Sequence, residues 1–331
     1  MSKLQVVVLS RRPVGKDDPV AQVLAPLDAR VVACWMDDPK FDDLARDADA
    51  FVFSGGFTAE MLAKAPKCRI IARDGVGFDA VDVAAATSRG VWVTIIPDAL
   101  VDDVADHALL LLMAANRRLS YLDGSTRAGE WRPAQMNVYG NPPRKLKGST
   151  LGIVGLGRIG RGVAERARGF GMSILAADPV TTTEAARAVG AELVPLDVLL
   201  ARSDFVSLHV PLGEGTHHLI GERELRLMQP SAILVNTARG AVVDEPALIR
   251  ALQEGWIRGA GLDVFEKEPV DADNPLLKMS NVVVTPHIAS ASDVSNVERR
   301  REAAGEVLRV LSGGLPRPEA VVNKELFARN R

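Results

Sequence analysis

The sequence has little of three things that would narrow its class: cysteine, net charge and long apolar runs. Only two cysteines occur in 331 residues, Cys34 and Cys68, and their spacing matches neither CxxC nor a metal-ligand pattern. We therefore expect reduced thiols, no metal site and a cytoplasmic location. The formal net charge of −2 gives no reason to expect a nucleic-acid partner. No stretch approaches the roughly 18 apolar residues of a membrane span, so no membrane partner is expected.

Short apolar runs rich in β-branched residues alternate with helical patterns along the chain. They are continuous rather than alternating in polarity, which is typical of parallel strands covered on both faces. The pattern predicts an α/β protein with two doubly wound parallel sheets, and the length suits two domains. The expected strands are Gln5–Leu9, Val31–Cys34, Ala50–Phe53, Ile70–Ala72 and Val91–Thr94, then Leu151–Val154, Ser173–Ala177, Glu192–Val194, Phe205–Leu208, Ile233–Asn236, Gly259–Leu262 and Val282–Val284.

Two segments separate the two series of strands. Val101–Leu119 has a long helical pattern that is apolar nearly all round, so we expect a helix buried between domains or subunits. The following segment, Asp123–Lys147, contains Gly129, Pro133 and further prolines, and we expect it to be rich in loops.

A glycine pattern follows the strand Leu151–Val154 and opens a helical run. Gly155, Gly157 and Gly160 form G-x-G-x-x-G, the fingerprint of a dinucleotide site at a helix N-terminus. The first glycine permits a tight turn, the second a close approach of the pyrophosphate, and the third close packing of helix on strand. The alternative interpretation is an ordinary strand-to-helix turn that binds nothing.

Asp178 ends the next strand, where an acidic residue can accept hydrogen bonds from the ribose hydroxyls of the cofactor. Its charge would repel a 2′-phosphate, and residues 179–183 contain no Lys or Arg to bind one. The sequence thus favours NAD over NADP. The alternative is a turn residue before Pro179.

Three segments with charged residues follow later strands: Asn236–Gly240, Asp263–Pro269 and Thr285–Ser290. Ligands of open α/β sheets bind beyond the carboxyl ends of the strands, so these segments can converge on one site. Further motifs are Gly75–Asp79 with Asp82, Val104–Asp106 and His209–Pro211. With the glycine fingerprint, the chain resembles the D-isomer-specific 2-hydroxyacid dehydrogenases over nearly its whole length. This family includes phosphoglycerate, glyoxylate and hydroxypyruvate enzymes.

The resemblance implies an NAD-dependent oxidoreductase that interconverts a small 2-oxo acid and its D-2-hydroxy acid. It implies a catalytic trio of Arg239, Glu268 and His287. An imidazole can carry a proton near neutral pH, a neighbouring carboxylate favours its charged form, and a guanidinium can hold a substrate carboxylate. Taken singly, they could instead be a structural ion pair, a solvated loop residue and a loop cap.

The resemblance also implies the binding residues. The expected cofactor set is Gly155, Gly157, Arg158, Ile159, Gly160, Asp178, Val210, Thr237, Arg239 and Asp263, the last near the nicotinamide carboxamide. The expected substrate set is Val76, Gly77, Arg239 and His287, with backbone N–H groups of the first two on the substrate carboxylate. Asp74 departs from this pattern. We expect its side chain to face solvent, or the substrate to carry a compensating cationic or hydroxyl group.

The implied architecture is a Rossmann NAD domain, residues 101–290, inserted into a flavodoxin-like substrate domain made of 1–100 and 291–331. The implied assembly is a homodimer formed through the NAD domains around Val101–Leu119. Since Arg331 follows the last expected helix closely, we expect no extra regulatory domain of the kind that some phosphoglycerate dehydrogenases carry.

Other functions fit less well. A formate dehydrogenase would have Gln at the position of Glu268, and a phosphite dehydrogenase would have Lys at that of Val76. The segment Val104–Ala108 also resembles the C-terminal-binding-protein corepressors, so an NAD-sensing binding protein with little turnover is the alternative function. Of the other histidines, we expect His209 to be packed at a strand end and the adjacent His217 and His218 to lie in a solvated loop.

Overall fold

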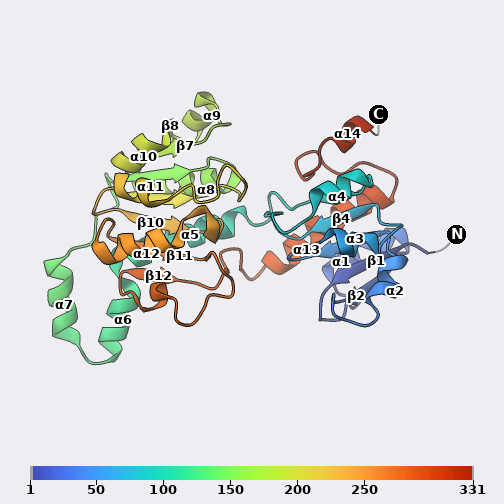
Figure 1. Cartoon of the computed structure of the whole chain (residues 1–331), viewed down its shortest axis with the longest axis horizontal. Helices are drawn as coiled ribbons and strands as arrows, with labels where there is room; N and C mark the ends of the chain where they lie inside the picture. Colours follow the sequence, from blue (N-terminus) through green and yellow to red (C-terminus); the bar gives the residue numbers. More distant parts are fainter. Residues whose placement is uncertain (1–2, 330–331) are drawn as a thin grey trace. The chain divides into compact units, whose positions relative to one another are not determined.

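A computed structural model describes residues 3–329 of the chain as two compact units (Figure 1). One unit combines the described residues up to Leu100 with those from Ser292 onward, and the other spans Val101–Ala291. The sequence places these boundaries at residues 100 and 290. Over the described residues, no helix has both the length and the apolar character required to cross a membrane.

The first unit contains a five-stranded parallel sheet in the order β2-β1-β3-β4-β5, which is the flavodoxin-like order. The strands are nearly those predicted, because buried β-branched runs leave few alternatives. They are β1 (Gln5–Leu9), β2 (Arg30–Cys34), β3 (Ala50–Phe53), β4 (Ile70–Arg73) and β5 (Trp92–Thr94). The helices are α1 (Pro19–Leu24), α2 (Phe41–Arg46), α3 (Ala59–Ala63), α4 (Val83–Ser88), α13 (Ser295–Leu311) and α14 (Leu326–Arg329), with the 3-10 turn η1 (Ala25–Leu27).

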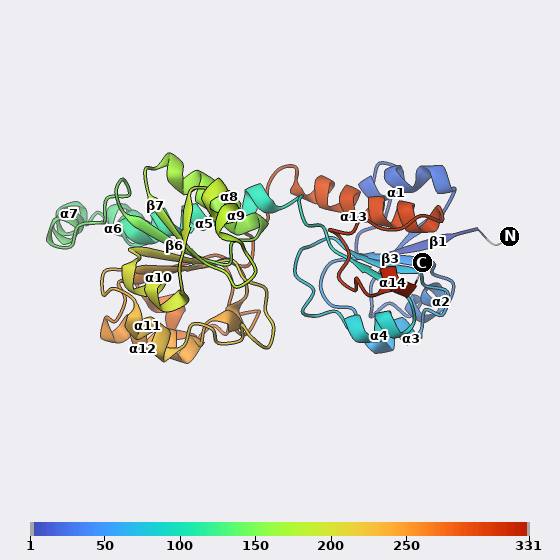
Figure 2. The same cartoon turned by 90° about the horizontal axis from the view of Figure 1, so that it is seen from above.

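Helices cover both faces of this sheet. Figure 2 shows α1 and α13 on one face and α2, α3 and α4 on the other. Helix α13 comes from the C-terminal segment, and the Arg69 guanidinium donates to the Val310 carbonyl across a separation of 241 residues (2.7 Å). The buried Asn323 likewise accepts a hydrogen bond from the backbone N–H of Val93 on strand β5 (2.9 Å). The two segments of the chain therefore build one core.

The second unit contains a seven-stranded parallel sheet in the order β12-β11-β10-β9-β6-β7-β8. The strands are β6 (Thr150–Val154), β7 (Ser173–Ala177), β8 (Ala191–Leu193), β9 (Phe205–Leu208), β10 (Ile233–Asn236), β11 (Gly259–Leu262) and β12 (Val282–Val284). The helices are α5 (Val101–Arg117), α6 (Leu119–Arg127), α7 (Trp131–Gly140), α8 (Arg158–Gly169), α9 (Thr183–Ala188), α10 (Leu196–Arg202), α11 (Glu222–Leu227) and α12 (Glu245–Glu254), with the 3-10 turns η2 (Gly240–Val242) and η3 (Pro275–Lys278).

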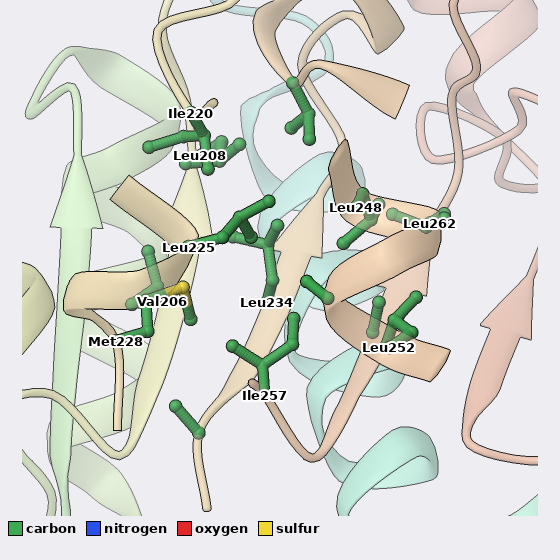
Figure 3. Packing of buried hydrophobic residues seen from close by; sticks show 14 of the residues in the cluster. Val206, Leu208, Ile220, Leu225, Met228, Leu234, Leu248, Leu252, Ile257 and Leu262 are labelled. Atoms are coloured by element: carbon green, nitrogen blue, oxygen red, sulfur yellow. The ribbon is translucent and has the colours of Figure 1, made fainter. Parts of the chain in front are cut away.

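Two apolar layers hold this sheet between its helices. Figure 3 shows one of them, in which Val206, Leu234 and Leu262 of the strands meet side chains such as Leu225 of α11 and Leu248 of α12. The other layer joins the opposite face of the sheet to α5, α8 and α9. Strands buried on both faces explain why their sequences are continuously apolar.

The expectation of a loop over Asp123–Lys147 is wrong. Helix α5 ends at Arg117, Arg118 has a positive φ of 52°, and α6 and α7 follow. The residues taken as helix breakers lie at helix ends. Gly129, with φ 81°, follows the end of α6, and Pro133 lies in the first turn of α7, where a backbone N–H is not needed.

Helix α5 covers one face of the sheet. Its inner face, including Ala105, Leu111 and Leu112, is buried against α8 and strands β10 to β12. Leu110 on the other side is 50% exposed. The helix is thus a one-sided cover of the sheet within this chain, and its predicted burial between subunits stays a prediction.

Candidate active site

The glycine turn between β6 and α8 has the conformation that its sequence predicts. Gly155 has φ 91°, and a Cβ there would lie 2.7 Å from the carbonyl oxygen of His209. A Cβ on Gly160 would lie 2.1 Å from the carbonyl oxygen of Gly155. Both positions therefore exclude any larger residue. By contrast, a Cβ on Gly157 would meet nothing within 4 Å, so the turn is open at that point.

Asp178, at the end of β7, holds this turn. Its carboxylate accepts hydrogen bonds from the backbone N–H groups of Leu156 (2.7 Å), Val180 (2.8 Å) and Thr181 (2.9 Å). Partial burial raises the pKa of Asp178, but these three N–H groups outweigh it and the pKa lies below its ordinary value. The carboxylate is thus charged at neutral pH and fixed beside the glycine turn.

The surroundings of the turn fit a dinucleotide. The N-cap residue of α8 is Gly157, which has no side chain to cap the helix, and a helix N-terminus favours an anion. The Val210 side chain lies 2.8 Å from where a Cβ of Gly155 would be. The Thr237 hydroxyl is buried and has no hydrogen-bond partner among the described residues, as expected of a group that awaits a ligand.

The carboxyl ends of β10, β11 and β12 are level, because Asn236 pairs with Leu262 and Leu262 pairs with Val284. The three charged segments therefore leave the sheet at one edge. Asp263, the first residue after β11, is buried, and its carboxylate accepts from the Thr285 hydroxyl (2.5 Å) and the N–H groups of Ile288 (2.9 Å) and Ala289 (2.8 Å). This network fixes the loop that carries His287.

His287 and Glu268 meet in this region. The His287 Nδ1–H donates to Glu268 Oε2 (2.6 Å), and the other carboxylate oxygen accepts from the Phe265 N–H (3.1 Å). His287 has φ 53°, and its backbone N–H donates to the Asp263 carbonyl (2.8 Å). Within residues 3–329 no group bonds Nε2, and about half of the imidazole side chain is exposed (48%). The ring thus presents Nε2 outward with its opposite nitrogen held by a carboxylate.

Arg239 follows β10 in a turn that Asn236 ties together, since the Asn236 side chain bonds both the Arg239 carbonyl and the Ala238 N–H. The next residue, Gly240, lies so close to the loop after β11 that a Cβ would be 1.9 Å from the carbonyl carbon of Phe265. This contact brings the Arg239 turn against the loop that ends in Glu268.

Two further residues, Thr285 and His107, support this loop through a hydrogen bond that the sequence does not reveal. The hydroxyl of Thr285 gives its single hydrogen to Asp263, so the bond to His107 Nε2 (2.9 Å) has the histidine as donor. A chain of hydrogen bonds thus runs from helix α5 to the loop of His287. Of this chain of bonds, the sequence singles out only the segment Thr285–Ser290. It does not show that His107, 178 positions away, is the partner of Thr285.

Val76 and Gly77 lie in the other unit, in the loop after β4. The Arg73 guanidinium donates to the carbonyls of Gly77 and Gly55, which fixes the backbone of this loop. The expectation that Asp74 faces solvent is wrong: the residue is 5% exposed, accepts from the Ser54 hydroxyl (2.6 Å) and lies 3.9 Å from Arg299 Nε. A cation of the protein itself compensates the carboxylate.

The contacts of two further histidines, His209 and His218, are well defined. His209 donates to or accepts from the Ser207 hydroxyl (2.8 Å), and burial lowers its pKa to about 4, so it is neutral at physiological pH. His217 and His218 are exposed residues of a turn, as predicted, and His218 also contacts Glu266 through Nε2 (2.6 Å) and stacks on His217. This contact ties a surface loop to the segment that contains Glu268.

Comparison with known proteins identifies the chain. Residues 109–289 match the family model for the "D-isomer specific 2-hydroxyacid dehydrogenase, NAD binding domain". The glyoxylate reductase of Korarchaeum cryptofilum is 49% identical over 287 residues, which cover 85% of this chain and 84% of that protein. The chain belongs to the D-isomer-specific 2-hydroxyacid dehydrogenase family. This membership makes it an NAD-binding oxidoreductase that acts on CH–OH donors.

Solved structures of this family share the whole fold. The D-lactate dehydrogenase of Aquifex aeolicus, in complex with NAD and lactic acid, has 31% identity and a TM-score of 0.81, and the match covers 96% of this chain and 99% of that one. An NADPH-dependent glyoxylate/hydroxypyruvate reductase from Sinorhizobium meliloti has 33% identity and a TM-score of 0.80, with 96% and 98% covered. Members of this fold thus use either nicotinamide cofactor.

Proposed function

We propose that this dehydrogenase reduces a small 2-oxo acid of the glyoxylate class to its D-2-hydroxy acid with NADH. The observation that carries the proposal is the 2.6 Å bond between His287 Nδ1 and Glu268 Oε2 at the carboxyl edge of the sheet. It fixes the ring with Nε2 available as a proton donor. The names of the relatives support the substrate class, since the Korarchaeum protein is a glyoxylate reductase.

In this proposal His287 gives its Nε2 proton to the substrate oxygen and takes it back in the reverse reaction. The bound NADH supplies the hydride that reaches the carbonyl carbon. Glu268 stabilises the imidazolium before transfer and keeps the ring oriented after it. One hydride and one proton are added to the C=O bond, so the product is the alcohol and the histidine is left neutral.

Arg239 is proposed to hold the substrate carboxylate through two parallel N–H bonds, in a turn whose position Gly240 fixes. The backbone N–H groups of Val76 and Gly77 are proposed to bind the same carboxylate. The Arg73 bonds to the carbonyls of this loop support that role, because they orient its peptide groups before the substrate arrives.

For the cofactor, we propose that the N–H groups of Gly155–Gly160, including Arg158 and Ile159, hold the pyrophosphate. Asp178 would accept from the ribose hydroxyls, which favours NAD over NADP because the charged carboxylate repels a 2′-phosphate. Val210 and the unpartnered Thr237 hydroxyl would line the remaining path to the nicotinamide. Arg239 and Asp263 would lie near the carboxamide group of the nicotinamide.

We further propose a homodimer formed through the NAD-binding unit. Its α6–α7 hairpin and the outer side of α5 carry exposed apolar side chains, among them Trp131 (62%), Met136 (74%), Tyr139 (81%) and Leu110 (50%). Apolar side chains gathered in this way mark interfaces in soluble proteins. A mass measured in solution that corresponds to one chain would contradict this assembly.

The test of the catalytic roles compares His287→Ala with Glu268→Gln. We expect the first to lower kcat for glyoxylate reduction by about 100-fold or more, the scale of a positioned acid–base group, while NADH binding followed by fluorescence is retained. In the wild type, kcat/KM should fall with rising pH for reduction and show the opposite limb for oxidation. Glu268→Gln should move the reductive limb to lower pH. A His287→Ala enzyme with near-normal kcat and an unchanged pH profile would refute the mechanism and favour a non-catalytic NAD-binding protein.

A further inference from the structure

A small cavity lies in the NAD-binding unit, away from the residues proposed for catalysis. It has a volume of about 220 Å³ and is lined by Ala115, Arg118, Asn141, Arg258 and Asn281. Arg258 and Asn281 directly precede β11 and β12, so the cavity is at the amino ends of these strands. Asp263 and His287 follow the carboxyl ends of the same strands. The cavity is therefore at the opposite edge of the sheet from the candidate active site.

The two arginines of the cavity are bonded only to neutral groups. The Arg258 guanidinium donates to the carbonyls of Asn141 (3.1 Å) and Pro142 (2.8 Å). Arg118 donates to the Asn137 side chain and lies over the ring of Tyr121, 4.5 Å from its centroid. Within residues 3–329 neither guanidinium forms an ion pair, whereas Arg144 and Arg166 of the same unit each contact an aspartate at 2.7 Å.

Two observations indicate that the positive charges of these groups are poorly compensated. The Nε–H of Arg118 is buried and has no acceptor among the described residues, which is costly for a charged donor. Burial, and after it the positive charge of Arg118, lower the pKa of Arg258, so the two charges are close enough to repel each other. An oxyanion in the cavity would accept hydrogen bonds from the guanidinium N–H groups that line it and would offset the repulsion.

We propose that this cavity binds a small divalent oxyanion, of the chemistry shared by inorganic phosphate and short dicarboxylates. Planar guanidinium groups offer paired N–H donors that match carboxylate and phosphate oxygens. The size restricts the ligand, since pockets for larger organic ligands usually measure about 300–1,000 Å³. A nucleotide is therefore excluded, and a free anion of a few heavy atoms fits.

The test is the thermal unfolding of the whole protein in millimolar phosphate, with sodium chloride added to hold the ionic strength constant. Saturating NAD is present throughout, so that the glycine turn is occupied. We expect the midpoint to rise and then level off as the site fills. Arg258→Gln, which keeps a hydrogen-bond donor but removes the charge, should weaken apparent phosphate binding by about tenfold or more. Arg187→Gln, at an exposed position on α9, is the charge-matched control and should leave it unchanged.

Three outcomes would overturn the proposal. A rise that never saturates and is equal in all variants is the general effect of an excluded solute. Phosphate binding that is lost as the chain associates would mean that a carboxylate of a second copy occupies the cavity. If Arg258→Gln does not fold, the phosphorus NMR line width of phosphate is measured in the presence of the wild-type protein. A line that does not broaden, or broadening that malonate does not reduce, refutes the site.

Discussion

Two buried aspartates follow strands of the two sheets, and their charges are met in different ways. Asp263 in the NAD-binding unit is 1% exposed and accepts from one hydroxyl and two backbone N–H groups. Asp74 in the other unit is 5% exposed and has one hydroxyl and the guanidinium of Arg299. The carboxylate of Asp263 is held mainly by hydrogen bonds from a hydroxyl and backbone N–H groups, with His107 Nε2 3.6 Å from it, whereas the charge of Asp74 is compensated by the cation of Arg299 at 3.9 Å.

The difference separates two uses of a buried carboxylate. Since the partners of Asp263 include the N–H groups of Ile288 and Ala289, its charge organises the loop next to His287. Asp74 lies beside a loop proposed to bind a carboxylate, where an uncompensated negative charge would repel the substrate. The positive charge of Arg299 compensates the negative charge of Asp74. Asp263 thus positions a loop, whereas the charge of Asp74 is compensated so that it does not repel the substrate.

The largest effect is expected from removing Asp263. Asp263→Ala deletes three hydrogen bonds that fix the loop of His287, and a displacement of about 1 Å there can cost on the order of 100-fold in kcat. Thr285→Val removes only one of the three donors and should cost less. The measurement is kcat for 2-oxo acid reduction alongside NADH affinity. An Asp263→Ala enzyme with unimpaired kcat would show that the dipole network does not set the position of the histidine.

The second prediction concerns the cation. Arg299→Met leaves Asp74 buried with only the Ser54 hydroxyl, which should destabilise the protein by about 2 kcal/mol, less than for a fully buried pair because Arg299 is partly exposed. The double change with Asp74→Ala should recover most of this loss. Arg309→Met is the control, because Arg309 on the same helix lies equally far from a carboxylate, 3.9 Å, but is more exposed (55%). If the losses of unfolding free energy measured in urea are additive for the two single changes, the two groups are not coupled.

The third prediction extends the comparison to a buried base. The pKa of His209 is lowered to about 4 in the folded protein, while an unfolded histidine has a pKa of about 6.5. Between these values the unfolded state binds more protons, so stability falls as the pH drops from about 6.5 to about 4, by roughly 3 kcal/mol in all. His209→Gln should remove this slope and His218→Gln should not. Unfolding free energies measured between about pH 4 and about pH 6.5 would distinguish the two variants.

The smallest effect is expected at Asp178, a partly exposed carboxylate that neutral N–H groups hold, as they hold Asp263. Asp178→Ala should narrow the preference for NADH over NADPH by about tenfold, mainly through KM for the cofactor, because one repulsion and the ribose contacts are lost. Steady-state kinetics with both cofactors give the ratio. A wild-type enzyme that uses NADPH as efficiently as NADH would contradict the assigned role.

The sequence predicts well what depends on neighbouring residues. Both sheets follow from continuous apolar runs, and the turn at Gly155 requires a positive φ of 91°, which glycine adopts most readily. The α6–α7 hairpin was missed because Gly129 and Pro133 act differently at helix ends than within helices. Whether a glycine or proline ends a helix or lies in its first turn depends on where the helix starts, which periodicity alone gives poorly.

Buried charge was harder to predict, because its partners are distant in sequence. The solvent-facing position expected for Asp74 was wrong since Arg299 comes from the last long helix, α13. The donor to Thr285 lies on α5, and no motif connects the two. Residue types therefore identified the candidate chemistry, while the pairing that tunes it required the fold.

The two-segment construction of the first unit has a consequence for synthesis on the ribosome. Residues up to Leu100 emerge first, but α13, which covers one face of their sheet, follows only after the whole NAD-binding unit has been made. Val101–Ala291 is continuous and can fold as soon as it emerges, as domains generally do during translation. Until then, strands β3 and β4 of the nascent N-terminal segment lack the helix that covers one of their faces, so their apolar residues are open to a chaperone.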